Sequence, residues 1–123
     1  MVTQHQQYGQ KGEIDAIRHL EKRGYRILER NYRTKLGEID IIAREGKTIV
    51  FVEVKARKSN HFGNPKWAVT AEKQRKISMV ALHYLKTTRQ SQTKARFDVV
   101  AIQSETEPPR IELVRNAFEL AYR

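Results

Sequence analysis

The sequence contains no cysteine. Disulfide bonds and thiolate metal sites are therefore excluded, which favours the reducing cytoplasm as the compartment. A metal site in this chain would have to use carboxylates, histidines or backbone oxygens. Carboxylates select hard ions such as Mg²⁺ or Mn²⁺. Because His5, His19 and His83 show no ligand spacing, and His61 is best read as a surface residue, the acids are the candidate ligands.

Long apolar runs are also missing. No stretch is long enough to cross a bilayer, and the start of the chain has no apolar core of an export signal. We therefore expect no membrane partner. The 123 residues are 39% hydrophobic and 31% charged, which fits a single domain over residues 1–123 with a modest core. Only the polar residues 1–8 are expected to be disordered.

What the chain has in excess is positive charge. Lys and Arg total 24 against 14 Asp and Glu, so the net charge is +10, and the basic residues are spread along the whole sequence. This distribution favours a folded basic surface for a polyanion, most often nucleic acid, over a disordered basic arm. A basic protein with no such partner is the alternative.

Hydrophobic periodicity predicts an α/β fold. Helical spacing runs over residues 9–23, and again from the expected N-cap Thr70 to about residue 86. Strands are expected over residues 25–33, 38–43, 48–56, 97–102 and 111–115, and a short final helix over residues 117–122. The order α-β-β-β-α-β contains a hairpin followed by a helical crossover, which implies a mixed sheet flanked by helices.

The predicted hairpin over residues 38–56 carries charges inside apolar strands. A two-residue turn at residues 46–47 would place Asp40 opposite Glu53, with their Cβ atoms about 4.5–5.5 Å apart on one face. A divalent cation would relieve the repulsion between these carboxylates. Lys55 would lie beyond Glu53 on the same face. On spacing alone, a Glu53–Lys55 ion pair with a solvated Asp40 is the alternative.

Two helix residues could complete this site. Glu13 lies on the apolar stripe of the first helix, where a carboxylate is unusual unless it meets a cation. The alternative is an acid placed in the first turn by the helix dipole. Lys73 lies on the apolar stripe of the second helix and points either at the same site or into solvent. On the hairpin itself, Glu38 would face Lys55, as a structural partner of Lys55 or of an arginine.

The loop that follows the hairpin mixes basic and aromatic residues. Arg57, Lys58 and Lys66 could bind phosphates, and Phe62 and Trp67 could stack on exposed bases. A small satellite core made by the two aromatic residues is the alternative.

Asp40, followed across the hairpin by Glu53-Val54-Lys55, resembles the D…ExK core of the PD-(D/E)xK nuclease superfamily. The element order is similar to the restriction-endonuclease-like core. The segments GEID, FVEVKAR and RFDVV resemble more closely the bacterial YraN-like family, uncharacterised proteins related to archaeal Holliday junction resolvases. This resemblance covers about residues 9–102. Ile39 stands where the superfamily motif has a proline.

The resemblance implies roles for individual residues. Asp40 and Glu53 would be metal ligands, Glu13 an auxiliary residue of the metal site, and Lys55 the group that orients the attacking water. It implies a Mg²⁺- or Mn²⁺-dependent endonuclease acting on DNA phosphodiester bonds, with branched or junction DNA as the leading substrate and a homodimer to hold two cleavage sites. Residues expected to bind the nucleic acid are Arg57, Lys58, Lys66 and Lys73.

Two further functions fit the same sequence. A nucleic-acid-binding module could keep the nuclease fold without turnover, with Asp40, Glu53 and Lys55 as a stabilising charge network. A basic RNA-associated protein is the third reading. Binding of Mg²⁺ or Mn²⁺ would favour the enzyme over the binding module, and competition between RNA and DNA at a stated salt concentration would test the third reading.

Overall fold

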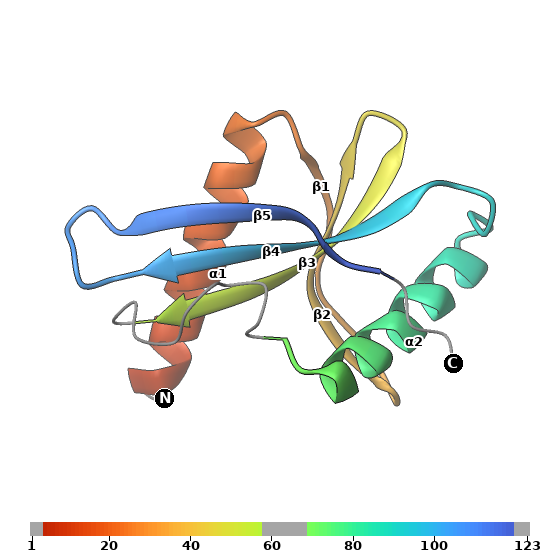
Figure 1. Cartoon of the computed structure of the whole chain (residues 1–123), viewed down its shortest axis with the longest axis horizontal. Helices are drawn as coiled ribbons and strands as arrows, with labels where there is room; N and C mark the ends of the chain where they lie inside the picture. The colour runs from red at the N-terminus through yellow and green to blue at the C-terminus, as the bar shows by residue number, and fades with distance from the viewer. Residues whose placement is uncertain (1–3, 58–68, 120–123) are drawn as a thin grey trace.

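The alternating apolar segments form a five-stranded sheet with a helix packed on each face (Figure 1). The computed structural model describes residues 4–57 and 69–119, with side chains from Lys11 on. The elements are α1 (Gln4–Lys22), β1 (Arg26–Thr34), β2 (Gly37–Glu45), β3 (Thr48–Arg57), α2 (Ala71–Thr87), β4 (Ala95–Gln103) and β5 (Arg110–Phe118). Their spatial order in the sheet is β1-β2-β3-β4-β5, and β3 and β4 alone are parallel.

The predicted α/β class and the order α-β-β-β-α-β are confirmed, with the crossover helix α2 between the parallel strands. Thr70 is the N-cap of α2, as expected, and its Oγ1 accepts a hydrogen bond from the Lys73 amide at 3.2 Å. Neither helix in the described ranges is both long and apolar enough to span a bilayer.

Both chain ends differ from the sequence expectation. Helix α1 begins at Gln4 rather than Gly9, so it overlaps the stretch expected to be disordered; glutamine is a good helix former and extends a helix that is already packed. The final helix expected over residues 117–122 is wrong for residues 117 and 118, which form the end of strand β5. Residues 120–122 lie outside the described part. Phe118 stacks on Phe97 with ring centroids 4.6 Å apart, and this contact favours the strand.

The hairpin register is the predicted one. Glu45 pairs with Thr48 and Ile42 with Phe51. Gly46 has φ +59° and Lys47 has no positive φ, as the type II′ turn requires. Side chains of β3 therefore alternate as expected between the two helices. Ile49 and Phe51 pack on the α2 side, while Val50 and Val52 pack on the α1 side.

Helix α1 approaches the sheet closely at Gly12. A Cβ atom at this position would lie 3.3 Å from the Cβ of Ala56, which leaves little room for a side chain. Ala16 and Leu20, further along the helix, are fully buried against the same face of the sheet. Glu13, the next residue of α1, accepts a hydrogen bond from Asn31 of β1 and lies near enough to Asp40 of β2 for its charge to act there.

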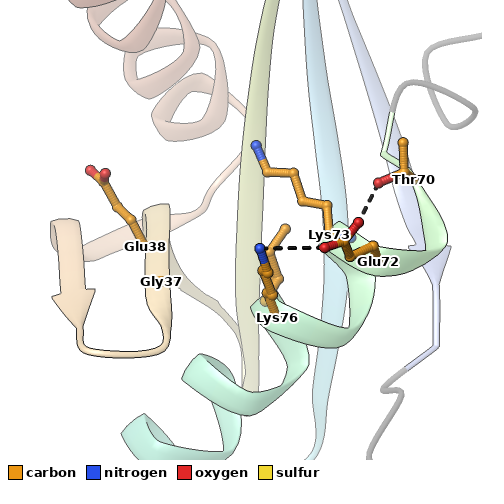
Figure 2. Close-up of a pocket in the computed structure, with 7 residues that line it drawn as sticks. Gly37, Glu38, Thr70, Glu72, Lys73 and Lys76 are labelled. Atoms are coloured by element: carbon orange, nitrogen blue, oxygen red, sulfur yellow. Dashed lines mark hydrogen bonds and ion pairs between the residues drawn. The ribbon is translucent and has the colours of Figure 1, made fainter.

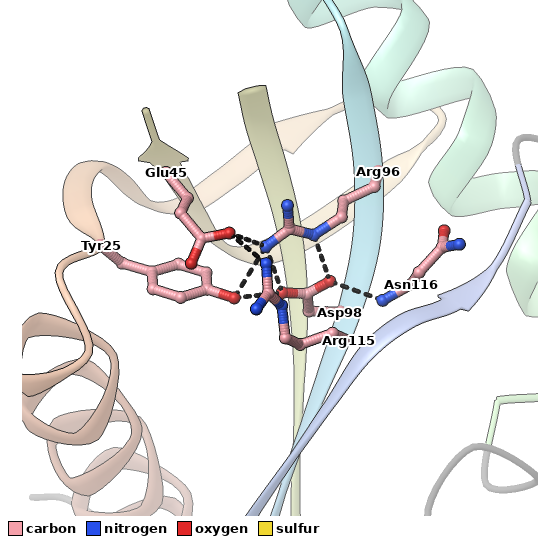
Figure 3. A network of polar contacts seen from close by, with 6 residues as sticks. All are labelled: Tyr25, Glu45, Arg96, Asp98, Arg115 and Asn116. Carbon is pink, nitrogen blue, oxygen red and sulfur yellow. Dashed lines mark hydrogen bonds and ion pairs between the residues drawn. The ribbon is translucent and has the colours of Figure 1, made fainter. Parts of the chain in front are cut away.

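A buried polar network ties the outer elements to β4 (Figure 3). Asp98 is fully buried and accepts hydrogen bonds from the Tyr25 hydroxyl (2.8 Å), Arg96 Nε (3.0 Å) and the Asn116 amide (2.9 Å). Arg96 also donates to Glu45 at 2.7 Å. Burial, then the hydrogen bond to Asp98, raise the pKa of Tyr25 to about 12. All partners are supplied by the chain, so this network is structural.

The network predicts a graded loss of stability. Asp98→Ala removes the acceptor of three donors and leaves Arg96 without one of its two carboxylate partners, so the free energy of unfolding should fall by about 3–5 kcal/mol. Tyr25→Phe removes two hydrogen bonds, the one donated to Asp98 and the one accepted from Arg96, and should cost about 1–3 kcal/mol. Urea denaturation measures both. Glu105→Ala, at an exposed acid, is the control and should leave the midpoint unchanged. Equal midpoints for Asp98→Ala and this control would contradict the assignment.

Candidate functional site

Asp40 stands where strands β2 and β3 separate. The paired ladder ends at Ile41 and Val52. Beyond that point Asp40 Oδ2 accepts a hydrogen bond from the Val54 amide at 2.9 Å, so a carboxylate replaces a backbone carbonyl as the acceptor. The predicted direct pairing of Asp40 with Glu53 is therefore wrong in detail, because the ladder stops just before it.

The alternation of β2 also changes at this point. Ile42 packs on the α2 side, but so does Ile39, which strict alternation along β2 would place on the opposite, α1 side. The strand twists between these residues. The twist brings the carboxylate of Asp40 to the edge of its own strand, within reach of the β3 backbone.

Glu53 is held on the α2 side of β3 by two lysines. Its side chain is only 6% exposed, and its Oε1 lies 2.7 Å from Lys73 Nζ and 3.6 Å from Lys55 Nζ. The Glu53–Lys55 ion pair considered from the sequence is present. Lys73, expected either to face this site or to be solvated, points at Glu53 from the first turn of α2.

Negative charge is concentrated between the two acids. Burial, and then the charge of Glu53, raise the pKa of Asp40 to about 7; the charge of Glu13 acts in the same direction, while the Val54 hydrogen bond and Lys73 oppose it. Burial lowers the pKa of Lys73, but the hydrogen bond and charge of Glu53 outweigh it, so the net shift is upward. The site therefore favours an added positive charge.

Glu13 reaches the site through Asn31. With its amide nitrogen facing the two acids, Asn31 donates to Glu13 Oε1 at 2.8 Å and to Glu38 Oε1 at 3.0 Å. Asn31 has φ +52°, a left-handed conformation that asparagine tolerates, and it lies within β1 between the residues that pair with Ile41 and Ile39. Glu38 also pairs with Arg33 at 3.4 Å. Of the two partners expected for Glu38, the arginine is therefore the one found, and within the described ranges no ion pair joins Glu38 to Lys55.

The acids of this site fit a magnesium-type ion. No three His, Asp or Glu side chains in the described part of the chain form a ready-made cage. Mg²⁺ does not need one, because it is usually held by one or two carboxylates, water and substrate phosphate oxygens. Asp40 and Glu53 supply such a pair of carboxylates. The Lys73 ammonium already places a positive charge on Glu53. Glu13 acts on this pair through its charge and is itself bound to Asn31.

A hollow opens beside Lys73 (Figure 2). It has a volume of about 370 Å³ and lies between the start of β2 and the first turns of α2. Its lining residues are Gly37, Glu38, Thr70, Glu72, Lys73, Lys76 and Ile77. Its size and mixed lining suit a polar ligand segment that runs past the site.

The predicted nucleic-acid-binding residues have different outcomes. Lys73 is at the site, and Arg57 ends β3 just beyond Lys55. Lys58 and Lys66 lie outside the described residues, as do Phe62 and Trp67. The role of all four in nucleic-acid binding stays a prediction.

Sequence reasoning missed Asn31 and Lys76. An asparagine inside a predicted strand is a signal for an irregular conformation and could have drawn attention to Asn31. Lys76 follows Lys73 on the same helical face, so helical spacing could have placed both at one hollow.

Comparison with known proteins shows similarity over nearly the whole chain. A family model described as "Uncharacterised protein family UPF0102" matches residues 12–102. The chain is 55% identical over 121 residues to a UPF0102 protein of Syntrophus aciditrophicus, covering 98% of this chain and 95% of the relative. It is 54% identical over 122 residues to one of Geobacter metallireducens, covering 99% and 100%. The matched range extends over the whole candidate site, from residue 13 to residue 73.

The raised pKa of Asp40 predicts an unusual pH dependence of stability. Between about pH 4 and pH 7 the folded chain keeps a proton on Asp40 that the unfolded chain has lost, so the free energy of unfolding should fall as the pH rises. Asp40→Asn keeps an acceptor for the Val54 amide but cannot ionise. This variant should be more stable than the wild type at pH 8, by about 1–2 kcal/mol.

Urea denaturation from pH 4 to pH 8 measures this difference. Glu21→Gln, at an exposed acid of α1, should follow the wild-type profile. If Asp40→Asn and the wild type lose stability in parallel over this range, Asp40 is not the group that titrates.

Proposed function

The chain belongs to the uncharacterised protein family UPF0102, and we propose that it is a metal-dependent endonuclease that hydrolyses nucleic-acid phosphodiester bonds. The observation that carries the proposal is the position of Asp40 beside Glu53 at the end of the hairpin, with two lysines on the same glutamate. Two acids this close, one with a strongly raised pKa, favour a divalent cation. The net charge of +10 favours a polyanionic substrate.

Each residue has a definite part in this reaction. Asp40 and Glu53 would hold Mg²⁺ or Mn²⁺, which when bound polarises a phosphoryl oxygen and lowers the pKa of water. The Val54 amide fixes the orientation of the Asp40 carboxylate. Lys55, whose Nζ lies 3.6 Å from Glu53 Oε1, would orient the attacking water and stabilise developing negative charge. Glu13 would add negative charge that strengthens ion binding.

The substrate is proposed by resemblance to the Holliday junction resolvases. Branched DNA is therefore the first substrate to test, with plasmid DNA beside it. A homodimer would place two cleavage sites symmetrically on a junction. Arg57, Lys58 and Lys66 would bind the DNA backbone next to the site.

One observation favours a second function. Glu53 is already neutralised by Lys73 and Lys55 within the chain. In a nucleic-acid-binding module without turnover, these two lysines would balance the charge of Glu53 and no metal ion would be needed. The two functions differ in whether the protein binds a divalent cation.

Cleavage assays test the endonuclease directly. Wild-type protein should nick supercoiled plasmid and cut a synthetic four-way junction in Mg²⁺ or Mn²⁺. Asp40→Asn, Glu53→Gln and Lys55→Ala should each lower the rate on the order of 100-fold or more, because each removes a group that holds the ion or acts on the water. Gel electrophoresis measures the products.

Glu21→Gln, at an exposed acid of α1 outside the hollow, is the matched control and should cut at the wild-type rate. Identical cleavage by the wild type and Lys55→Ala in every metal would overturn the proposal. Calorimetry decides against the binding module if Mn²⁺ binds the wild type and not Asp40→Asn. DNA binding that is indifferent to metal, with no heat of metal binding, would instead establish the module.

A further inference from the structure

Lys73 is the best-fixed cation at the candidate site. Its Nζ lies 2.7 Å from Glu53 Oε1, nearer than the Lys55 ammonium at 3.6 Å. Its backbone is also held, because its amide donates to the N-cap Thr70. Glu53 is almost fully buried, so this ion pair is shielded from water at the carboxylate end. An uncompensated carboxylate at that depth would be costly, and Lys73 removes the cost.

The same pair sets up a competition. A divalent ion held by Asp40 and Glu53 would meet the ammonium of Lys73 at a carboxylate that the lysine already occupies. Two cations this close repel each other. Metal entry is therefore easier if Lys73 gives up its place on Glu53.

The Lys73 side chain has open space beside it. Its side chain is 43% exposed, and it lines the hollow of about 370 Å³ together with Lys76 and Thr70 (Figure 2). A lysine stem has several rotatable bonds, so the ammonium can leave Glu53 while the helix stays in place. Lys76 pairs with the exposed Glu72 at 3.6 Å, a weak surface contact. The hollow would then present two ammonium groups.

From this geometry we infer that Lys73 is an exchangeable counter-ion, which neutralises Glu53 until a divalent ion binds and then contacts a backbone phosphate of the nucleic acid. The inference rests on the proposed function, since it needs a metal at Asp40 and Glu53. It makes metal binding and nucleic-acid binding favour each other, and such coupling is reciprocal. Lys73 thus has a role beyond simple attraction of the substrate.

Mn²⁺ titration calorimetry without nucleic acid tests the exchange. Lys73→Met removes the competing ammonium, so Mn²⁺ should bind about tenfold tighter than to the wild type. Lys73→Arg keeps a cation and should return the affinity to near the wild-type value. Lys76→Met is the matched control: it removes the same charge one turn further along α2, and should change the affinity far less.

The outcomes separate this inference from the proposed function. Equal Mn²⁺ affinity in the wild type and Lys73→Met overturns the exchange and leaves the nuclease proposal standing. Equal tightening by Lys73→Met and Lys76→Met also overturns it, because the effect is then one of net charge. Absence of Mn²⁺ binding in every variant overturns both proposals.

A second measurement tests the coupling. Fluorescence anisotropy with a hydrolysis-resistant phosphorothioate duplex gives the DNA affinity with and without Mn²⁺. In the wild type Mn²⁺ should increase this affinity by a larger factor than in Lys73→Met. An equal increase in both proteins would show that Lys73 does not pass from Glu53 to the nucleic acid.

Discussion

The hydrogen bond from the Val54 amide to the Asp40 carboxylate is the contact on which the candidate site depends. It holds β2 and β3 together after their backbone ladder ends, and it keeps Asp40 close enough to Glu53 for one charge to raise the pKa of the other. Without it, the strand ends would separate and the two acids would be solvated independently. The end of the β2–β3 ladder thus frees the Val54 amide to bind Asp40, and the carboxylates of Asp40 and Glu53 come to lie close together.

Asp98 and Asp40, two acids on inner strands, have opposite surroundings. Asp98 is fully buried and receives Tyr25, Arg96 and the Asn116 amide, so its charge is balanced inside the fold. Asp40 receives a single backbone donor in the described structure and lies next to another acid. An acid with a complete set of donors supports the structure, whereas an acid left short of positive charge is suited to an external cation. This contrast is the reason why Asp40, and not Asp98, is the candidate for a functional acid.

Much of the fold was predictable because it follows from local rules. Gly46 fixed the hairpin register, alternation placed Glu53 on the α2 side, and Thr70 marked the start of α2. The membership of an uncharacterised bacterial family is confirmed, while the relationship to nucleases stays a prediction. The end of the ladder at Ile41, the contact between Lys73 and Glu53, and the strand conformation of Phe118 depend on residues distant in sequence, so no local pattern could show them.

The two outer strands share a feature with a different consequence. Asn31 in β1 and Asn116 in β5 both have left-handed backbones, and each outer ladder contains a register shift. Such irregularities break the even row of amides and carbonyls along the rim of a sheet. A strand from another molecule could then not pair along the full length of either outer strand. Such irregular edge strands therefore discourage crowded copies of the chain from pairing edge to edge into fibrils.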